Sequence, residues 1–512
     1  MRPRTAVIVA LAALAAAVGG SSAASAATSF TTPVKLTGAF GGEPSIAADS
    51  LGNVFVVGPQ GIPSGVSGHP GIGFWKSGDD ATSFPPARFI GSDVGGGDSD
   101  VLVTPNNDVY AADLEAVATQ ICKSTDHGQT FTSIGPVPDP THCSHVGIGQ
   151  AGPSDDRQWL TSDRQGHIYL TYHEFVSAQP LAFRSDNGGA DLFSHTCGSI
   201  VTDPSIEANV PQDITGGTLV ARPVTDAAGN LYVLFATTTQ QENAAALAQG
   251  KPSGTFSQLY LAVSHDHCQS FTDYTVYDGS KRGTNTVQFG DIFNAITVDG
   301  AGNLYTIGAG YVGTKPFAPV AKLYLFSSTD GGRHWTAPVE VGPGGAHMLP
   351  AAVAGPAAGQ VAIGYFHTVN GVTDPNSSSA RWTYTTAETR NGTAAHPAFS
   401  YADVNPGFVY HSGEICNLGI LCGTIPGQPS DRSLLDFTSA TLDPHGCPLF
   451  TFAGNPNGVD NGTFNYVTRQ TSGCFTAKKA RHRHRHHRHR HHHHRHRHRH
   501  HRHRHRQPHF TG

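Results

Sequence analysis

Hydrophobic and polar positions follow one pattern that recurs seven times along the chain. Each copy is a short alternating run, then a turn that contains Gly or Asn, then a second run with an aromatic or aliphatic residue. Runs of this length that are rich in Val, Ile, Leu and Tyr are typical of β-strands. The copies are Ser45–Phe55, Val101–Tyr110, Trp159–Tyr169, Val220–Tyr232, Ile296–Tyr305, Ala352–Ala362 and Ala440–Leu449.

The spacing of these copies indicates the fold class. Successive turns lie 55 to 87 residues apart. A long period with room for about four strands per unit indicates a β-propeller. We therefore expect an all-β propeller of seven four-stranded blades at residues 27–477. Six or eight blades remain open, because the longest interval has room for a further unit.

A second motif falls between the copies. Ser124–Phe131 and Ser328–Trp335 both read Ser-x-Asp-x-Gly-x-x-aromatic, Ser77–Phe84 and Ser264–Phe271 are weaker copies, and Ser185–Gly189 is a remnant. Asp can cap a turn between two strands, Gly can adopt its tight backbone, and the aromatic ring can pack between blades. The motif resembles the Asp-box, or BNR repeat, of sialidase-like propellers. That resemblance implies a structural role for the motif, away from the active face.

Two further segments extend the resemblance. Residues 156–159 read Asp-Arg-Gln-Trp, and residues 416–436 contain two Cys followed by Arg-Ser-Leu-Leu-Asp. Both are similar to segments of secreted sialidase-like proteins, often classed as exo-alpha-sialidase-like, and the resemblance covers nearly the whole of residues 27–477. It implies a secreted propeller that binds or hydrolyses extracellular glycan, with a true exo-alpha-sialidase as one alternative.

The N-terminal segment is expected to close the ring. Phe30–Leu36 is similar to Trp335–Val341, which follows an Asp-box, but it has no blade of its own before it. The last copy, which ends near Arg469, lacks an outer strand. Pairing of the two would complete the last blade and cover both free edges.

The first residues have the form of a secretory signal peptide. Arg2 and Arg4 precede the apolar run Ala6–Val18 and the small residues Ala24–Ala26. A short apolar run with a small-residue cleavage site predicts a signal peptide at residues 1–26, and a retained membrane anchor is the alternative. No later segment approaches the roughly 20 apolar residues of a membrane span. We expect a secreted, extracellular protein.

Eight cysteines fit an oxidising compartment. Pairing each with its nearest neighbour along the chain is one of about 105 possible connectivities. A zinc site is disfavoured, because no Cys-x-x-Cys is present. The nearest-neighbour pairs are Cys122–Cys143, Cys197–Cys268, Cys416–Cys422 and Cys447–Cys474.

Charge is divided unevenly between the body and the tail. Of the 33 Lys and Arg, 13 lie in residues 478–512, which contain no acid and 16 of the 31 His. Two more Arg lie in the leader, so the body has 18 bases against 38 acids and a formal charge of −20. Such a body does not suit nucleic acid. The 60 Gly, 33 Pro and 14% charged residues also exclude helical bundles and coiled coils.

The tail is expected to be disordered, because Arg481–Arg506 contains only Arg and His. Clustered imidazoles such as His491, His492, His493 and His494 could hold Zn²⁺, Ni²⁺ or Cu²⁺. The arginines could bind a cell-surface polymer or another polyanion. A low-complexity extension without a role is the alternative.

Alignment of the copies on their turns predicts one polar mouth of the propeller channel. Its residues either precede an innermost strand or follow a second strand. The candidates for catalysis are Asp98, Asp156, Arg157, Tyr172 and Glu174. The candidates for ligand binding are Glu43, Asp113, His173, Asp291, Arg432 and Asp436. The alternative is that polar side chains line the channel because it is wet.

These residue types allow several kinds of chemistry. A carboxylate pair such as Asp98 with Glu174 could hydrolyse a neutral glycoside. The resemblance implies three arginines for a sialic acid carboxylate and a Tyr–Glu nucleophile, but Glu43 stands where the first arginine is expected. Acidic side chains could instead bind Ca²⁺. A non-catalytic binding propeller with a metal- or polyanion-binding tail remains the second class of function.

Overall fold

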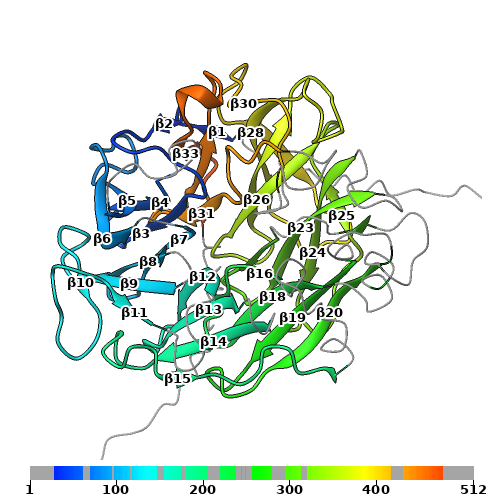
Figure 1. Cartoon of the computed structure of the whole chain (residues 1–512). Helices are drawn as coiled ribbons and strands as arrows, with labels where there is room; N and C mark the ends of the chain where they lie inside the picture. The colour runs from blue at the N-terminus through cyan, green and yellow to red at the C-terminus, as the bar shows by residue number, and fades with distance from the viewer. Residues whose placement is uncertain are drawn as a thin grey trace, which may run out of the picture. The chain divides into compact units, whose positions relative to one another are not determined.

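The structure is a computed structural model. It describes residues 28–60, 70–94, 97–115, 118–146, 155–174, 179–204, 219–237, 244, 248, 257–279, 287–288, 294–312, 320–416, 422 and 430–476. These residues form seven antiparallel sheets arranged as the blades of a propeller, which confirms the expected fold and blade number. Figure 1 shows innermost strands such as β3, β7, β12 and β31 facing a common centre. The expected signal peptide and tail lie outside the described residues.

In each of the first three blades, the chain begins at the innermost strand and adds the following strands outward. Blade 1 contains β3 (Ser45–Ala48), β4 (Val54–Gly58), β5 (Pro70–Ser77) and β6 (Arg88–Val94). Blade 2 contains β7 (Ser99–Val103), β8 (Val109–Glu115), β9 (Ala118–Ser124), β10 (Thr132–Ser133) and β11 (Ser144–His145). Blade 3 contains β12 (Asp155–Ser162), β13 (Ile168–Glu174), β14 (Gln179–Ser185) and β15 (His195–Thr196).

In blades 4 and 5 the innermost position is shared by two short strands. Blade 4 contains β16 (Leu219–Val220), β17 (Val224–Thr225), β18 (Leu231–Thr237), β19 (Gln258–Ser264) and β20 (Thr272–Asp278). Blade 5 contains β21 (Val287–Gln288), β22 (Ala295–Val298), β23 (Leu304–Val312), β24 (Ala321–Ser328) and β25 (Val339–Val341).

Blades 6 and 7 account for the longest interval between copies. Blade 6 contains β26 (His347–Ala354), β27 (Val361–Thr368), β28 (Arg381–Thr389), β29 (Phe399–Asp403) and β30 (His411–Ser412). Blade 7 contains β31 (Ser439–Leu442), β32 (Pro448–Gly454) and β33 (Phe464–Ser472), with the short 3-10 helix η4 (Val459–Asn461) before β33. The interval therefore contains outer strands of blade 6 rather than an eighth blade.

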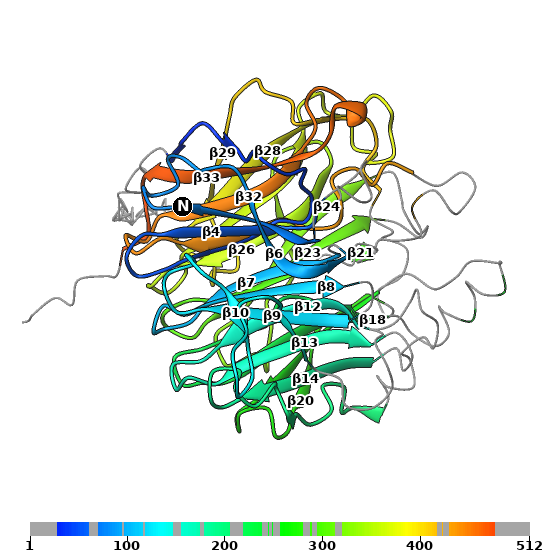
Figure 2. The ribbon, with the colours of Figure 1, turned by 60° about the vertical axis from the view of Figure 1, so that its left-hand side comes forward.

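The N-terminal strands complete blade 7, as expected. β1 (Ser29–Phe30) and β2 (Val34–Lys35) both pair antiparallel with β33. Ser29 lies opposite Ser472, and their hydroxyl oxygens are 2.7 Å apart. Figure 2 shows the blue N-terminal segment beside the orange β33. The closure pairs the outer edge of β33, which would otherwise be open, with strands from the other end of the described chain.

One turn explains the recurring sequence pattern. Asp226 Oδ1 accepts hydrogen bonds from the N–H groups of Ala228 and Asn230, both at 2.9 Å. Its Oδ2 accepts the hydroxyl of Tyr232 at 3.0 Å, and Gly229 has φ 87°. Asp therefore closes the turn, Gly supplies a left-handed backbone, and the aromatic residue anchors the second strand. The backbone bonds of this turn recur at Asp49, Asp163, Asp299 and Asp443.

The Ser-x-Asp segments form a second recurring turn, between the third and fourth strands. Ser124 Oγ donates to Asp126 Oδ1 at 2.7 Å and accepts the N–H of Gly128 at 2.8 Å. A Cβ on Gly128, which has φ 72°, would lie 2.9 Å from the Phe55 ring. The same Ser-to-Asp bond occurs at Ser77, Ser264 and Ser328.

The hydrophobic core lies in layers between neighbouring blades. Between blades 1 and 2, Phe55 and Phe74 are buried against Val109 and Ala111, and Phe131 packs edge-on to Phe74 with ring centroids 5.0 Å apart. Each such phenylalanine contributes about 2 kcal/mol through burial. The aromatic residue that ends the Ser-x-Asp segment thus packs between two blades, as expected from the sequence.

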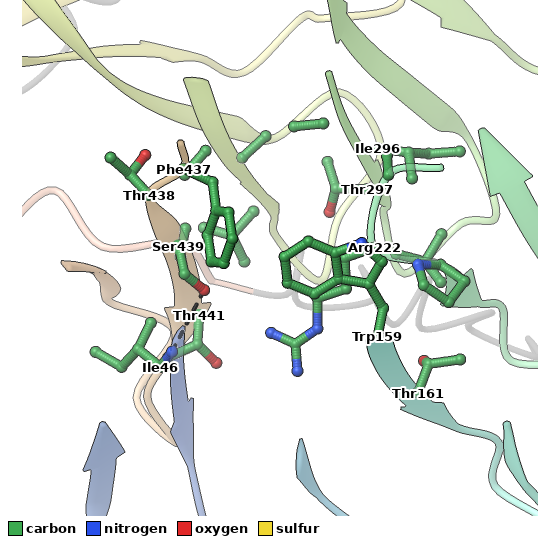
Figure 3. A pocket seen from close by; sticks show the side chains of 18 of the residues that line it. Ile46, Trp159, Thr161, Arg222, Ile296, Thr297, Phe437, Thr438, Ser439 and Thr441 are labelled. Carbon is green, nitrogen blue, oxygen red and sulfur yellow. Dashed lines mark hydrogen bonds between the residues drawn. The ribbon is translucent and has the colours of Figure 1, made fainter. Parts of the chain in front are cut away.

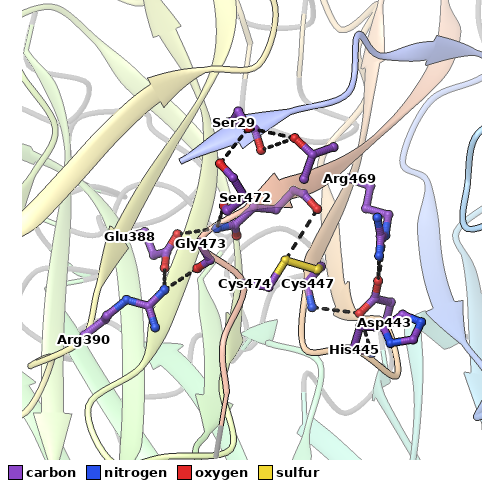
Figure 4. Close-up of a disulfide and its surroundings, with 12 residues drawn as sticks. Ser29, Glu388, Arg390, Asp443, His445, Cys447, Arg469, Ser472, Gly473 and Cys474 are labelled. Carbon is purple, nitrogen blue, oxygen red and sulfur yellow. Dashed lines mark hydrogen bonds and ion pairs between the residues drawn. A yellow bond between two sulfur atoms is a disulfide. The ribbon is translucent and has the colours of Figure 1, made fainter. Parts of the chain in front are cut away.

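All four predicted disulfides are present: Cys122–Cys143, Cys197–Cys268, Cys416–Cys422 and Cys447–Cys474. The last lies beside the ring closure (Figure 4). There Arg469 donates to Asp443 at 2.7 Å and Gln470 donates to Glu388 at 2.9 Å. Among the described residues, no helix has the length and apolar character that a membrane crossing requires.

Replacing Cys447 and Cys474 together by Ser is expected to lower the free energy of unfolding by about 3 kcal/mol. The disulfide joins residues 27 apart and constrains the unfolded chain accordingly. Denaturant unfolding measures the loss. The matched double replacement of Cys416 and Cys422, which are 6 apart, should cost about 2 kcal/mol. A stability equal to that of the unmodified protein for the first pair would contradict the expectation.

Candidate functional site at the channel mouth

The backbone is distorted where several innermost strands begin. Glu43, Arg157 and Leu349 each lie six residues before the turn of their blade and have φ values of 40°, 58° and 53°. A bulge interrupts the register of β12 between Asp156 and Trp159. Left-handed backbone at bulky residues is strained, and bulges redirect side chains, so both features are frequent at functional sites.

The distortion brings together charged residues from several blades. They belong to blades 1, 2 and 3 and to the segment that precedes blade 7. We call these six residues the mouth cluster: Glu43, Asp98, Asp156, Arg157, Arg432 and Asp436. All six were among the residues predicted from the sequence.

Asp436 is the centre of the ion pairs in the mouth cluster. Its Oδ2 lies 3.1 Å from Arg157 Nη2 and 2.6 Å from Arg432 Nη2. Arg432 also lies 3.6 Å from Glu43, and Arg157 lies 3.8 Å from Asp156. Asp436 and Arg157 are almost fully buried. One carboxylate therefore holds both arginines of the cluster.

Two carboxyl groups of the mouth cluster take up protons readily. Burial raises the pKa of Glu43, and the charge of Asp98 raises it further. Burial and the charge of Asp98 raise the pKa of Asp156 to about 7, although Arg157 opposes the change. The Asp156 side chain is 22% exposed, so solvent can reach it. Asp156 can therefore act as a proton donor near neutral pH.

Asp436 behaves in the opposite way. Burial alone would raise its pKa, but Arg432 and Arg157 hold the pKa of Asp436 below its usual range. The same ion pairs raise the pKa of both arginines. An ionised carboxylate and a protonatable one thus lie in one cluster. Glu43, Asp156 and Asp436 each lie within 4 Å of a guanidinium group, so this donor set is a poor fit to Ca²⁺, which needs several free oxygen ligands.

The mouth cluster adjoins a cavity of about 310 Å³ inside the channel. Arg157 lines its end, and the wall comes from innermost strands of all seven blades. Trp159 and Phe437 cross it edge to face, with centroids 4.8 Å apart, and the Trp159 indole donates to the Val220 carbonyl at 3.2 Å (Figure 3). The aromatic pair lies next to the mouth cluster along the chain, because Trp159 follows Arg157 by two positions and Phe437 follows Asp436.

The third arginine near the channel has a different partner. Arg222 lies 3.2 Å from buried Asp100 and donates to the Val101 carbonyl at 2.6 Å. Asp100 also accepts the Ser45 hydroxyl and the Leu160 N–H. Asp100 therefore links the innermost strands of blades 1, 2 and 3. Arg222 of blade 4 pairs with Asp100 and does not join Arg157 and Arg432 at Asp436.

Tyr172 and Glu174 belong to a separate group between blades 2 and 3. Glu174 lies opposite Asp155, which accepts the Thr119 N–H at 3.2 Å. Burial and the charge of Glu174 raise the pKa of Asp155 to about 6. Tyr172 is 2% exposed and stacks on Phe183, and burial raises the pKa of its phenol. The phenol is thus packed in the core.

Strand geometry explains this grouping. Neighbouring residues of a strand point to opposite faces. Glu174 therefore shares a face with Asp155, whereas His173, which is buried, lies opposite Asp156. The position of Glu174 beside Asp155 differs from the expected pairing of Asp98 with Glu174. The sequence did not predict the raised pKa of Asp155, although the position of Asp155 next to Asp156 could have indicated it.

Of the remaining predicted residues, one lies in the part of the chain that the structure describes. Asp113 is buried at the end of β8, opposite Ser99. Asp291 and the tail residues His491, His492, His493 and His494 lie outside the described residues.

Comparisons with known proteins give structural likeness only. No family model and no curated protein matches the chain. An ulvan lyase of a polysaccharide lyase family is 12% identical with a TM-score of 0.49, covering 85% of this chain and 95% of its own. A protein of unknown function from Dyadobacter fermentans is 13% identical with a TM-score of 0.46, covering 86% and 98%. The GH93 alpha-L-arabinofuranosidase of Fusarium graminearum is 12% identical with a TM-score of 0.41, covering 86% and 97%. Values this low assign neither a family nor an activity to the chain.

Proposed function

We propose that the protein is a secreted propeller of the sialidase-like Asp-box type that hydrolyses a neutral extracellular glycan at the mouth cluster. Asp156 is the general acid that protonates the leaving oxygen. The observation that carries the proposal is its carboxyl group, which has a pKa of about 7. A group with this pKa donates protons well at the pH of most extracellular fluids.

A second carboxylate is needed to attack the sugar or to activate water. Asp98 fits this role best, because its charge raises the pKa of both Asp156 and Glu43. A carboxylate beside a carboxyl group with a raised pKa is the arrangement that glycoside hydrolysis requires. Asp436 is unsuited, because two arginines already hold it.

The charge of the mouth cluster supports a neutral substrate. Four carboxyl groups face two arginines, and protonation of Glu43 and Asp156 leaves the cluster balanced. A sialic acid carboxylate would need free guanidinium groups, whereas Arg157 and Arg432 are both bound to Asp436. Hydrolysis of sialosides is therefore the weaker alternative.

The four disulfides support the proposed secretion, because such bonds persist outside the cytosol. The signal peptide at residues 1–26 and the disordered, metal- or polyanion-binding tail at residues 478–512 remain part of the proposal. They rest on the sequence alone.

The test is turnover of a panel of neutral polysaccharides and aryl glycosides by the purified protein. The value of kcat is expected to fall as the pH rises above about 7, because the protonated form of Asp156 is the active one. Arabinans, other neutral glycans and sialosides form the panel. Glycan binding without any turnover would identify a binding propeller, and turnover of sialosides alone would identify a sialidase. Either result would overturn the proposal.

A further inference from the structure

Two histidines and one aspartate meet at the turn between the first and second strands of blade 3. Asp163 and His167 belong to this turn, and His267 comes from the Ser-x-Asp segment of blade 4. His167 Nδ1 lies 2.7 Å and His267 Nδ1 lies 3.5 Å from Asp163 Oδ2. The two imidazole rings are 4.4 Å apart. Because innermost strands begin at the mouth cluster and end at this turn, the group lies at the opposite end of the blade.

The two oxygens of Asp163 have different partners. Oδ1 accepts the N–H groups of Gln165 and His167 at 2.9 and 3.0 Å and thereby closes the turn. Oδ2 faces both imidazoles and accepts the hydroxyl of Tyr169 at 2.9 Å. The ligand atoms of the two histidines and Asp163 all lie within 4.8 Å of one another. One carboxylate oxygen and two ring nitrogens thus converge on one point.

Asp186 and Arg184 lie next to the two histidines on the side away from Asp163. Asp186 Oδ1 lies 3.7 Å from His167 Nε2, on the side of the ring away from Asp163. Arg184 lies 2.6 Å from Asp186 and also donates to the backbone carbonyl of His267. A carboxylate behind a metal-binding histidine orients its ring and increases its basicity.

Other blades show that the turn itself does not need a histidine. At the place of His167, blades 1, 4 and 5 carry Asn53, Asn230 and Asn303. Each Asn side chain donates to its turn aspartate, at 2.6, 2.7 and 2.9 Å. An amide nitrogen closes the turn but is not a metal ligand. His167 makes the same contact through Nδ1, and this ring nitrogen can bind a metal instead when it carries no proton.

Blade 1 offers an incomplete copy of the same group. His127, from the Ser-x-Asp segment of blade 2, lies 3.1 Å from Asp49 Oδ2, as His267 lies near Asp163. The third member there is Asn53, so only two ligand side chains are present. Among the described residues, blade 3 alone brings three such side chains together.

We propose that Asp163, His167 and His267 form a zinc site that joins blade 3 to blade 4. Two neutral imidazoles and a carboxylate are a donor set that Zn²⁺ prefers, and tetrahedral zinc places its ligand atoms about 3.3 Å apart. The distances from Asp163 Oδ2 to the Nδ1 atoms of His167 and His267, 2.7 and 3.5 Å, lie on either side of that spacing. The His side chains are 22% and 37% exposed, which gives the ion access from solvent. A water molecule completes the coordination.

The test compares the full-length protein with its His167→Asn variant. Asn occupies this place in three other blades, so the turn and the fold are expected to persist. After dialysis against buffered Zn²⁺, the variant should hold one zinc per chain less than the unmodified protein. The histidine-rich tail is identical in both proteins, so zinc bound there cancels. Crystals should show a zinc-edge anomalous peak about 2.1 Å from the three ligand atoms.

The matched control is His127→Asn at the incomplete copy in blade 1, which should leave the zinc content unchanged. A second readout is the rise in Tm on adding Zn²⁺, which should be smaller for His167→Asn than for His127→Asn. Equal zinc content in the unmodified protein and His167→Asn overturns the proposal. The absence of a peak at the three residues, or an equal loss of zinc in His127→Asn, overturns it as well.

Discussion

Replacing Asp156 by Asn is expected to lower kcat for glycan hydrolysis by about 10² to 10⁴, the usual contribution of a general acid. With its pKa near 7, Asp156 is largely neutral in mildly acidic solution. Asn has the shape of that neutral form but cannot transfer a proton. The fold should therefore persist while the chemistry is lost, as kinetics and unfolding on the same sample would show.

Two comparisons separate loss of the acid from loss of structure. An aryl glycoside with a highly acidic leaving group needs little protonation, so Asp156→Asn should slow its hydrolysis much less. Asp155→Asn is the matched control, because Asp155 is the next residue of β12 and belongs to the group between blades 2 and 3. Its kcat should stay within a few-fold of the original. An equal loss for both variants and both substrates would exclude Asp156 as the acid.

Replacing Arg157 by Met is expected to lower the free energy of unfolding by about 3 to 5 kcal/mol, the cost of breaking a buried ion pair from one side. Arg157 is 5% exposed and lies 3.1 Å from buried Asp436. Without it, Arg432 is the one positive side chain left in the mouth cluster as the described residues define it. Chemical denaturation measures the change.

The controls for Arg157 follow from the same ion pairs. Arg157→Lys keeps the charge and should cost less than Arg157→Met. Adding Asp436→Asn to Arg157→Met removes the uncompensated carboxylate and should recover part of the loss. A stability of Arg157→Met within about 1 kcal/mol of the original would mean that solvent already screens the pair.

Local patterns predicted the fold well because the turns that define each blade are local. In five of the seven copies an Asp closes the first turn within a few positions of a Gly and of a large residue in the second strand, so the repeat was visible in the sequence. Nearest-neighbour pairing of the cysteines also succeeded. Strands that follow one another in the chain are adjacent in a blade, which keeps most bridged cysteines in one sheet or in neighbouring sheets.

The candidate site was predicted only in part. Alignment of the copies brought Glu43, Asp98 and Arg157 to one mouth, and the structure groups them there. The ion pair of Arg157 with Asp436 joins residues 279 apart, so no local pattern reveals it. The bulge in β12 and the alternation of β13 decide that Glu174 faces Asp155. The bulge and the strand register depend on the backbone conformation, which residue types alone do not predict.

The closure of blade 7 has a consequence for the order of events during folding. Ser29 and Ser472, which meet in that blade, are 443 positions apart. During synthesis the first strands must therefore wait for nearly the whole body of the protein before their partner exists. Bringing such distant segments together costs much entropy unless the intervening blades have already folded and hold the ends near each other. The last blade is thus expected to assemble last. In a newly made chain, β1 and β2 stay unpaired until translation of β33 is complete.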